Sequence, residues 1–467
     1  MSGLESLSRE DLLGLIAMQQ RQIEDLKEQV ADLQARLDRN SGNSSMPPSS
    51  DGFAKPERRK KPSSGRSKGK QPGSPGTGLA LMEHPDATVD VFPPACGGCG
   101  SALTCAGSVG FARRQCHDIP PSSAVVTETR WHRVRCGCGR VTAAPVPDGI
   151  PDAPYYGPNL AALAVYLLVY QHIPVERCAR LVFDVTGAAV STGWVSSQLP
   201  KAARLVEAPN KLIAALLVLG HVLHADETCT NVAGVKSWLH VACTGRLALF
   251  TLAPRSKAGA AAAGVLPGFT GTMVHDALWL YRGFPDAAHQ LCCAHVIREL
   301  TWCDERFAAE HWPAQIRWAI AEMIKAADRA RTEGLDRVPP ERLRRWRIYY
   351  DSGVQVGLEH HPVDPLTAGQ SKQTNLLLRL RDEREDYLRF TGDLTVPATN
   401  NQAERDLRPI KTQLKISGCH ASKTGAQNWL AIRSYLVTAI KHGLGALDVI
   451  RRAILGQAWM PPIAMAL

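Results

Sequence analysis

The sequence lacks any apolar run long enough to cross a lipid bilayer. Its longest apolar stretches, Ala161–Tyr170 and Leu212–Leu219, are much shorter than the roughly 20 residues that a transmembrane helix needs. The first residues, MSGLESLSREDLL, also lack the basic segment and apolar core of a secretory signal. We therefore expect a protein without a membrane partner, located in the cytoplasm.

Large apolar residues are almost absent from residues 40–78, which are rich in Ser, Pro, Gly and Lys. Such a segment cannot bury enough apolar surface to offset its ordering entropy, so we predict a disordered basic linker. The net charge of the chain is +10, yet residues 55–70 carry eight Lys and Arg against Glu57 alone. This cluster either neutralises DNA phosphates or keeps a linker solvated, and the two interpretations are compatible.

Disulfides are not expected from the thirteen cysteines, because no export signal is visible. Within residues 79–148, two cysteine pairs resemble the knuckles of a zinc ribbon: Cys96 and Cys99, then Cys136 and Cys138. The second pair is C-x-C rather than C-x-x-C, and 36 residues separate the pairs, which is unusually many. Either a structural zinc site with these four ligands or a ribbon without its metal remains open. Four further side chains are possible substitute ligands: Cys105, Cys116, His117 and His132.

A heptad repeat runs through residues 8–39. Two seam positions alternate along it, namely Ile16, Ile23, Val30 and Leu37 at one and Leu12, Gln19, Leu26 and Leu33 at the other. β-Branched residues at the first position and Leu at the second favour a parallel two-stranded coiled coil, and one polar residue in the seam fixes the register. We predict a homodimer or higher oligomer through this segment; the alternative is an amphipathic helix packed on its own domain.

Residues 155–210 have the pattern of short helices. Pro174 and Ser191 stand where two of the helices begin, and Gly187 separates them, which fits a helix-turn-helix. The second helix of such a motif can enter a DNA major groove, where Lys201 and Arg204 would meet phosphates. A plain helical bundle explains the same pattern.

From residue 218 to about 440 the pattern becomes α/β. Strands are expected at 221–228, 237–244, 248–253, 273–276 and 290–294, with a helix at 257–264. The span between the fourth strand and Glu404 is longer than a compact fold needs, so residues of about 304–395 are interpreted as an inserted helical subdomain. Residues 441–467 are expected to form a C-terminal tail.

Three carboxylates, each inside a distinctive phrase, are the strongest functional signal. Asp226 lies in HVLHADET, Asp276 in GTMVHDALWLY and Glu404 in ATNNQAERDLRPIKTQLKISG. Oxygen ligands from distant segments are what a two-metal phosphoryl-transfer site requires. Because neighbouring residues of a strand face opposite ways, Asp226 and Glu227 are not expected to line one site together.

These phrases, together with HQLCCAHVIREL and RNSGNSSMPPSSD, resemble the insertion sequence 66 family of bacterial transposases over nearly the whole chain. The resemblance implies a ribonuclease-H-like catalytic core that binds Mg²⁺ or Mn²⁺ through Asp226, Asp276 and Glu404. It also implies cleavage at transposon ends and strand transfer into target DNA, in the bacterial cytoplasm at the nucleoid. Companion proteins of the mobile element are possible partners.

Positive residues follow Glu404 at helical spacing. If one helix persists past Pro409, then Arg408, Lys411 and Lys415 form a phosphate-binding stripe beside the third carboxylate. His289, Cys293 and His295 are expected to be buried supports of the catalytic pocket rather than ligands of a separate zinc ion.

Two alternative functions remain open at this point. A structure-specific nuclease would use the same metal site, because the site alone does not distinguish water from a 3′ hydroxyl as the nucleophile. A DNA-binding regulator would use the coil, ribbon and helix-turn-helix while the carboxylates do no chemistry, although three intact acids argue against it.

The predicted coiled coil gives a direct test. Replacing Ile23 and Leu26 by Lys places charges in an apolar seam whose burial is the main source of stability of the coil. Sedimentation of a peptide of residues 1–45 is expected to give dimers for the natural sequence and monomers for the double variant. A natural peptide that is already monomeric would contradict the coiled-coil prediction.

Overall fold

The computed structural model describes residues 9–37, 79–120, 122–147, 150, 153–366 and 369–463. The chain divides into two compact units, residues 57–127 and residues 128–467 together with the first 56 residues. The predicted linker, residues 40–78, lies outside the described residues. Among the helices described, none is long and apolar enough to cross a membrane.

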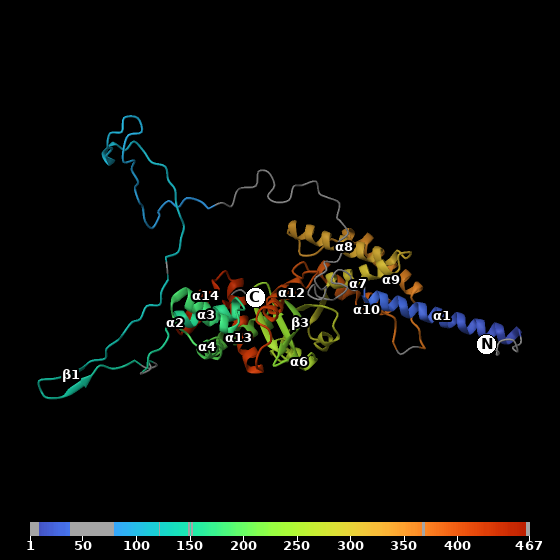
Figure 1. Ribbon diagram of the computed structural model, residues 1–467. Coiled ribbons are helices and arrows are strands. Elements are labelled where there is room, and N and C mark those ends of the chain that lie inside the picture. Colours follow the sequence, from blue (N-terminus) through green and yellow to red (C-terminus); the bar gives the residue numbers. More distant parts are fainter. Residues whose placement is uncertain are drawn as a thin grey trace, which may run out of the picture. The chain divides into compact units, whose positions relative to one another are not determined.

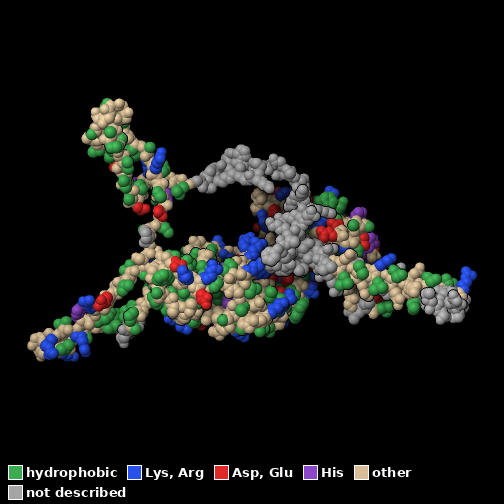
Figure 2. All heavy atoms as spheres, in the orientation of Figure 1, with side chains coloured by type: hydrophobic (Ala, Val, Ile, Leu, Met, Phe, Trp, Pro, Cys, Tyr) green, Lys and Arg blue, Asp and Glu red, His purple; other side chains and the backbone are tan. Residues whose placement is uncertain are grey.

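The heptad segment forms a single helix, α1 (Arg9–Leu37). Several of its apolar side chains are about half exposed, including Ile16, Ile23, Leu26 and Val30. Figure 2 shows hydrophobic side chains on the surface of this helix. The helix thus forms as the repeat predicts, and dimerisation through its apolar side stays a prediction.

The two cysteine knuckles lie in different units. In the unit of residues 57–127, the N–H of Cys96 donates to the carbonyl of Ser101 at 2.9 Å, which closes a tight turn around Cys99. In the other unit, β1 (Arg133–Arg135) and β2 (Val141–Ala143) form an antiparallel hairpin whose turn carries Cys136 and Cys138. Each pair is presented on a turn, as a zinc knuckle requires, and the zinc site itself stays a prediction.

A five-stranded mixed sheet forms the centre of the larger unit (Figure 1). Its strands lie in the order β5-β4-β3-β6-β7. The two pairings among β3, β4 and β5 are antiparallel, whereas β6 and β7 run parallel to β3. Four strands lie at the predicted runs, and the fifth lies two to three residues earlier than predicted, because a helix begins at Cys293. The bounds are β3 (Val222–Val232), β4 (Val235–Cys243), β5 (Ala248–Leu252), β6 (Thr272–His275) and β7 (Ala288–Leu291).

The hairpin between β3 and β4 extends the first strand beyond its predicted end. Ala233 and Gly234 have φ angles of 51° and 79°, so both central residues of the two-residue turn have positive φ. Such turns match the twist of the flanking strands and fix their register. Val232 therefore pairs with Val235, and further along the hairpin Asp226 lies opposite Val241.

Helices cover both faces of the sheet. On one face, α12 (Asn401–Ile416) packs on β3 and β4, and α13 (Lys423–Lys441) packs on β5. On the other face, α5 (Glu207–Val218) and α6 (Lys257–Ala261) bury Leu223 and Met273 in a separate apolar cluster. The sheet is therefore the middle layer of three.

The helices expected to form a helix-turn-helix share their core with the C-terminal part of the chain. The predicted tail is wrong, because α13 continues to Lys441 and α14 follows with four buried residues. α14 packs against α2, α4 and α13 in one apolar cluster that also includes β4 and β5. The elements are α2 (Pro158–Val165), a π-helix (Tyr166–Tyr170), α3 (Val175–Thr186), α4 (Thr192–Leu205) and α14 (Ala446–Ile454). Residues 155–210 are thus not a separate domain.

The span of residues 304–395 is helical, as predicted, and builds a second core. The apolar stripe of Ile316, Ile320 and Met323 is fully buried. It packs with β7 and with neighbouring helices of the insertion. These helices are α7 (Cys293–Arg306), α8 (Trp312–Thr332), α9 (Pro340–His360), α10 (Lys372–Asp382) and α11 (Arg384–Leu388).

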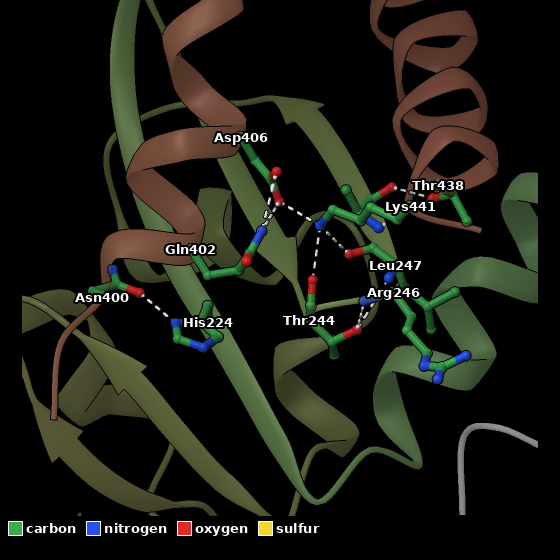
Figure 3. A network of polar contacts seen from close by, with 10 residues as sticks. His224, Thr244, Arg246, Leu247, Asn400, Gln402, Asp406, Thr438 and Lys441 are labelled. Carbon is green, nitrogen blue, oxygen red and sulfur yellow. Dashed lines mark hydrogen bonds and ion pairs between the residues drawn. The ribbon is translucent and has the colours of Figure 1, made fainter. Parts of the chain in front are cut away.

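A buried ion pair fastens α12 to α13. The ammonium of Lys441 lies 2.5 Å from the carboxylate of Asp406, and only 11% and 7% of these side chains are exposed. Lys441 also donates to the carbonyls of Thr244 and Leu247, so it joins both helices to the β4–β5 turn (Figure 3). Gln402 donates to Asp406 from one turn earlier on α12. All charges and donors of this network are thereby paired.

Replacing Lys441 by Met tests this fastening. The variant leaves the Asp406 carboxylate buried without its cation, and we expect the free energy of unfolding in urea to fall by about 3–5 kcal/mol. The double variant Asp406→Leu, Lys441→Met is expected to recover most of that loss, since both charges are removed. Lys423→Met, at the exposed start of the same helix, is the control and is expected to change stability by less than about 0.5 kcal/mol.

Candidate active site

Asp226 lies on β3, and Asp276 directly follows the adjacent parallel strand β6. β3 and β6 pair with Val222 opposite Thr272 and His224 opposite Val274, and the same register places Asp226 opposite Asp276. Neighbouring strands are about 4.8 Å apart, so two carboxylates on one face at this register are close. Val241, opposite Asp226, belongs to the cluster under α12 and α13, so Asp226 faces that layer.

Burial and neighbouring charges act on both aspartates. Burial raises the pKa of Asp226 well above its usual range, and the charges of Asp276, Glu227 and Glu404 raise it further. Burial and then the charge of Glu227 raise the pKa of Asp276 to about 6. A concentration of unneutralised carboxylates like this one is what a bound cation relieves.

Glu404 reaches this position because the start of α12 is tied to β3. The amide nitrogen of Asn400 donates to the carbonyl of Ala225 at 2.8 Å, and its oxygen lies 2.9 Å from Nδ1 of His224. The backbone N–H of Asn400 donates to Sγ of Cys292 at 3.1 Å. Asn400 is fully buried, and Glu404 follows it by one helical turn. Asn400 stands at the N-cap of α12, but its side chain makes no capping hydrogen bond and holds the helix on the sheet instead.

Glu227 lies on the opposite face of β3 and is already bound. Its carboxylate accepts hydrogen bonds from Arg255 at 2.9 Å and from the Tyr281 hydroxyl at 3.0 Å. Only 3% of the side chain is exposed. Glu227 therefore acts on the aspartates through its charge, and its oxygens are used by other partners. Arg255 and Tyr281 escaped prediction, because neither stands in a phrase that points to the site.

Two side chains of α7 face Glu404. His295 Nε2 and an Arg298 Nη atom lie 3.8 and 3.6 Å from the same oxygen of Glu404. Burial, followed by the charge of Arg298, lowers the pKa of His295 to about 4, so this imidazole is neutral near pH 7. His295 thus lies beside Glu404, and its role as a support of a catalytic pocket stays a prediction. Arg298 was not predicted from the sequence.

His289 and Cys293, which the sequence groups with His295, contact other residues. His289 on β7 is 2.9 Å from the His275 ring, and Cys293 is buried with its thiol 3.5 Å from the carbonyl of Tyr387. Burial raises the pKa of the Cys293 thiol well above its usual range. These contacts fit structural supports at a strand–helix junction.

The side chains do not form a ready-made ligand set. Within the described parts of the chain, no three or more His, Cys, Asp or Glu side chains are placed so that they could hold one metal ion. Asp226 and Asp276 have the donor chemistry and the shared charge that suit a cation, whereas Glu404 is turned toward α7. Mutual repulsion of three acids accounts for this arrangement.

A positive stripe leaves the site along α12. The helix continues through Pro409, so Arg408, Lys411 and Lys415 lie on the same helix as Glu404. Arg408 and Lys415 are exposed and Lys411 is half-buried. The condition placed on the stripe is therefore met. The loss of one backbone hydrogen bond at Pro409 is tolerated inside a helix that the core holds in place.

The second expected DNA-binding surface is on α4, where fewer polar side chains are exposed than the sequence suggests. Lys201 and Arg204 on α4 are exposed. Gln198 on the same helix is only 5% exposed and donates to the carbonyl of Trp194 at 3.0 Å. Its side chain is therefore unavailable for reading bases, and the exposed positive residues of α4 suit phosphates.

Comparison with known proteins identifies the family. A family described as Transposase IS66 family matches residues 154–428, which is more than half of the chain. A second, described as a family of unknown function (DUF6444), matches residues 5–80. No curated protein matches. The match spans the sheet, the helical insertion and all three carboxylates, and it confirms the resemblance found in the sequence. The chain belongs to the IS66 family of transposases, and its function is related to DNA transposition and DNA binding.

Proposed function

We propose that this protein cleaves DNA at the ends of a mobile element and joins those ends to target DNA with a ribonuclease-H-like core. The observation that supports the proposal is the β3–β6 register, which brings Asp226 and Asp276 to adjacent positions, together with the charge of Glu404, which acts on Asp226. The strand order, with antiparallel β3, β4 and β5 followed by parallel β6 and β7, supports this type of core. The proposed place of action is the nucleoid in the bacterial cytoplasm.

The three carboxylates would hold Mg²⁺ or Mn²⁺, which supplies activation of the nucleophile and neutralises charge that develops on the phosphate. Asp226 on β3 and Asp276, directly after β6, would provide two of the ligands. Glu404 has to turn from His295 and Arg298 to complete the set. The raised pKa values of both aspartates make cation binding favourable, since a cation replaces protons on crowded carboxylates.

The chain's own residues position the DNA for in-line attack. The positive side chains on α12, from Arg408 to Lys415, would contact phosphates of the DNA backbone at increasing distance from the carboxylates. Water first attacks a phosphodiester at the element end and releases a 3′ hydroxyl. That hydroxyl then attacks a phosphodiester of target DNA and displaces the 3′ oxygen of the target strand as the leaving group, and no covalent bond to the protein forms. Exposed Lys201 and Arg204 on α4 add phosphate contacts, and the α1 coil pairs two chains so that two ends are held together.

Substitution of the carboxylates tests the proposal. Asp226→Asn, Asp276→Asn and Glu404→Gln keep side-chain size and remove one negative ligand each. Each is expected to reduce cleavage and joining of labelled end DNA by roughly 10³-fold or more, with no further loss in double variants, because the residues act as one unit. DNA binding is expected to persist, since a carboxylate that faces phosphate is removed.

Glu227→Gln is the matched control, because its side chain lies on the opposite face and keeps oxygen for Tyr281. Cleavage is expected to remain. Full activity in either aspartate variant would refute the proposed mechanism. Full activity in Glu404→Gln would refute only the assignment of Glu404 as the third ligand. Cutting without joining by the natural protein would favour a nuclease, and binding without either reaction would favour a regulator.

The same site predicts an effect on stability without metal. The pKa of Asp276 is about 6 in the folded protein against an ordinary value of 3.8, so ionisation of Asp276 opposes folding. This penalty is absent below about pH 4, grows as the pH rises to about 6 and is constant above that value. In a chelator at pH 7.5, Asp276→Asn is therefore expected to unfold at a higher temperature than the natural protein.

Addition of Mg²⁺ should reverse the order. Ligand binding to the folded state raises the unfolding temperature of the natural protein, whereas the variant has lost a ligand and is expected to respond weakly. At pH 4 in chelator the two proteins are expected to unfold at nearly equal temperatures. Equal unfolding temperatures at both pH values would show that Asp276 is not buried among other charges.

A further inference from the structure

Arg298 on α7 is a mostly buried arginine that makes no hydrogen bond with any described residue. Its side chain is 21% exposed, its Nε is fully buried without a partner, and an Nη atom stops 3.6 Å from Glu404. At that distance the two groups attract each other, but the contact is too long for a hydrogen bond. The donors of this guanidinium are therefore largely unused.

Comparably placed arginines of the same region are bonded. Arg317, 33% exposed, donates to Asp304 at 2.8 Å and to Thr301 at 3.2 Å. Arg389, 32% exposed, donates to the carbonyl of His289 and to Asp386, each at 2.7 Å. Burial of donors without a partner disfavours folding, and in native structures such groups call for an explanation. Arg298 departs from its neighbours at the point where α7 meets the carboxylates.

A second unused donor or acceptor lies one turn earlier. His295 is three residues before Arg298, on the same face of α7, and its Nδ1 is buried without a partner. Both side chains point to the same oxygen of Glu404. The space between α7 and α12 therefore presents unsatisfied polar atoms directly beside the group that needs to turn away if a cation binds.

An anion that offers two oxygens side by side, such as a phosphate, fits these donors. A guanidinium presents parallel N–H groups that match two oxygens of a phosphate. Three carboxylates repel a DNA backbone, so one positive side chain within the site offsets that repulsion at the phosphate that must come closest. A carboxylate partner is present but stays beyond hydrogen-bond distance.

We propose that Arg298 binds non-bridging oxygens of the DNA phosphate that lies beside Asp226, Asp276 and Glu404. Glu404 turns from Arg298 toward Asp226 and Asp276, and the phosphate then binds the guanidinium of Arg298. This assignment rests on the proposed function, because it takes DNA as the substrate of the carboxylates. Arg298 is then a substrate-binding residue, and α7 contributes to the site alongside β3, β6 and α12.

The test uses the full chain and a duplex oligonucleotide with the sequence of an end of the mobile element that encodes it. One phosphate at a time around the cleavage position is replaced by an uncharged methylphosphonate. Cleavage is measured in Mg²⁺, and binding is measured by fluorescence anisotropy in Ca²⁺. We expect Arg298→Gln to slow cleavage of natural DNA about 100-fold, the size of effect seen when one donor to a reacting oxygen is lost.

The decisive result is the interaction between variant and substrate. At one position the methylphosphonate is expected to slow the natural protein strongly and to have no further effect on Arg298→Gln, in cleavage and in binding. Arg298→Lys should restore part of the rate, because it returns the charge without the fork. Arg317→Gln, which removes an arginine that has protein partners, should leave the methylphosphonate pattern of the natural protein unchanged.

Other outcomes are distinguishable. If Arg298→Gln and every methylphosphonate reduce rate and affinity independently, Arg298 touches no phosphate and the proposal is overturned. If the natural protein does not cleave in Mg²⁺, the proposed function fails, and the binding series in Ca²⁺ still decides whether Arg298 contacts DNA. Thermal unfolding shows whether Arg298→Gln is folded, and Arg298→Lys carries the same comparison if it is not.

Discussion

Three hydrogen bonds made by one buried asparagine hold together the elements that carry the candidate site. Asn400 joins the first turn of α12 to His224 and Ala225 on β3 and to Cys292 at the entrance to α7. Without that connection, Glu404 would be a residue on a helix with no fixed relation to Asp226. Below it, the pair of Lys441 and Asp406 prevents α12 from sliding along α13. Polar contacts at Asn400 and at Asp406 therefore fix α12 along its axis, whereas apolar packing alone would permit small shifts.

The site imposes a cost on the fold that the surrounding layers offset. Two half-buried aspartates share a face, and a third acid, Glu227, raises both of their pKa values from the other side of the strand. Arg255 and Tyr281 satisfy the Glu227 oxygens, so the strain is confined to the groups that are free to take a ligand. Crowded charge at a functional site, supported by fully bonded neighbours, is the expected compromise between stability and activity.

Local patterns in the sequence predict much of this architecture. Alternating apolar residues locate the five strands, the stripe from Ile316 to Met323 locates α8, and the phrases around the three carboxylates identify the family. Long-range partnerships are less accessible. Nothing near Gln198 reveals that its amide is buried, and nothing after Lys441 reveals that α14 returns to the first helices.

The same limit applies within the site. Asn400 resembles an ordinary helix cap until β3 is placed beside it, and Arg298 resembles a surface residue of α7 until its missing partners are counted. Pro409 predicted a break because its local effect is real, but packing of α12 on β3 and β4 outweighs one lost backbone bond. Residue type and spacing describe what a segment prefers, and the contacts made by distant segments decide the outcome.

The shared core of α2, α4, α13 and α14 has a consequence for synthesis of the protein. A ribosome that has completed residue 220 has made the N-terminal helices but not the helices that cover their apolar faces. Those faces stay exposed until residues near 450 leave the exit tunnel, since domains fold as units during translation. A chain cut short after Glu404 would hold every acidic residue of the candidate site and still lack a closed core. The core of this unit can therefore close only after the ribosome has made the whole chain as far as α14.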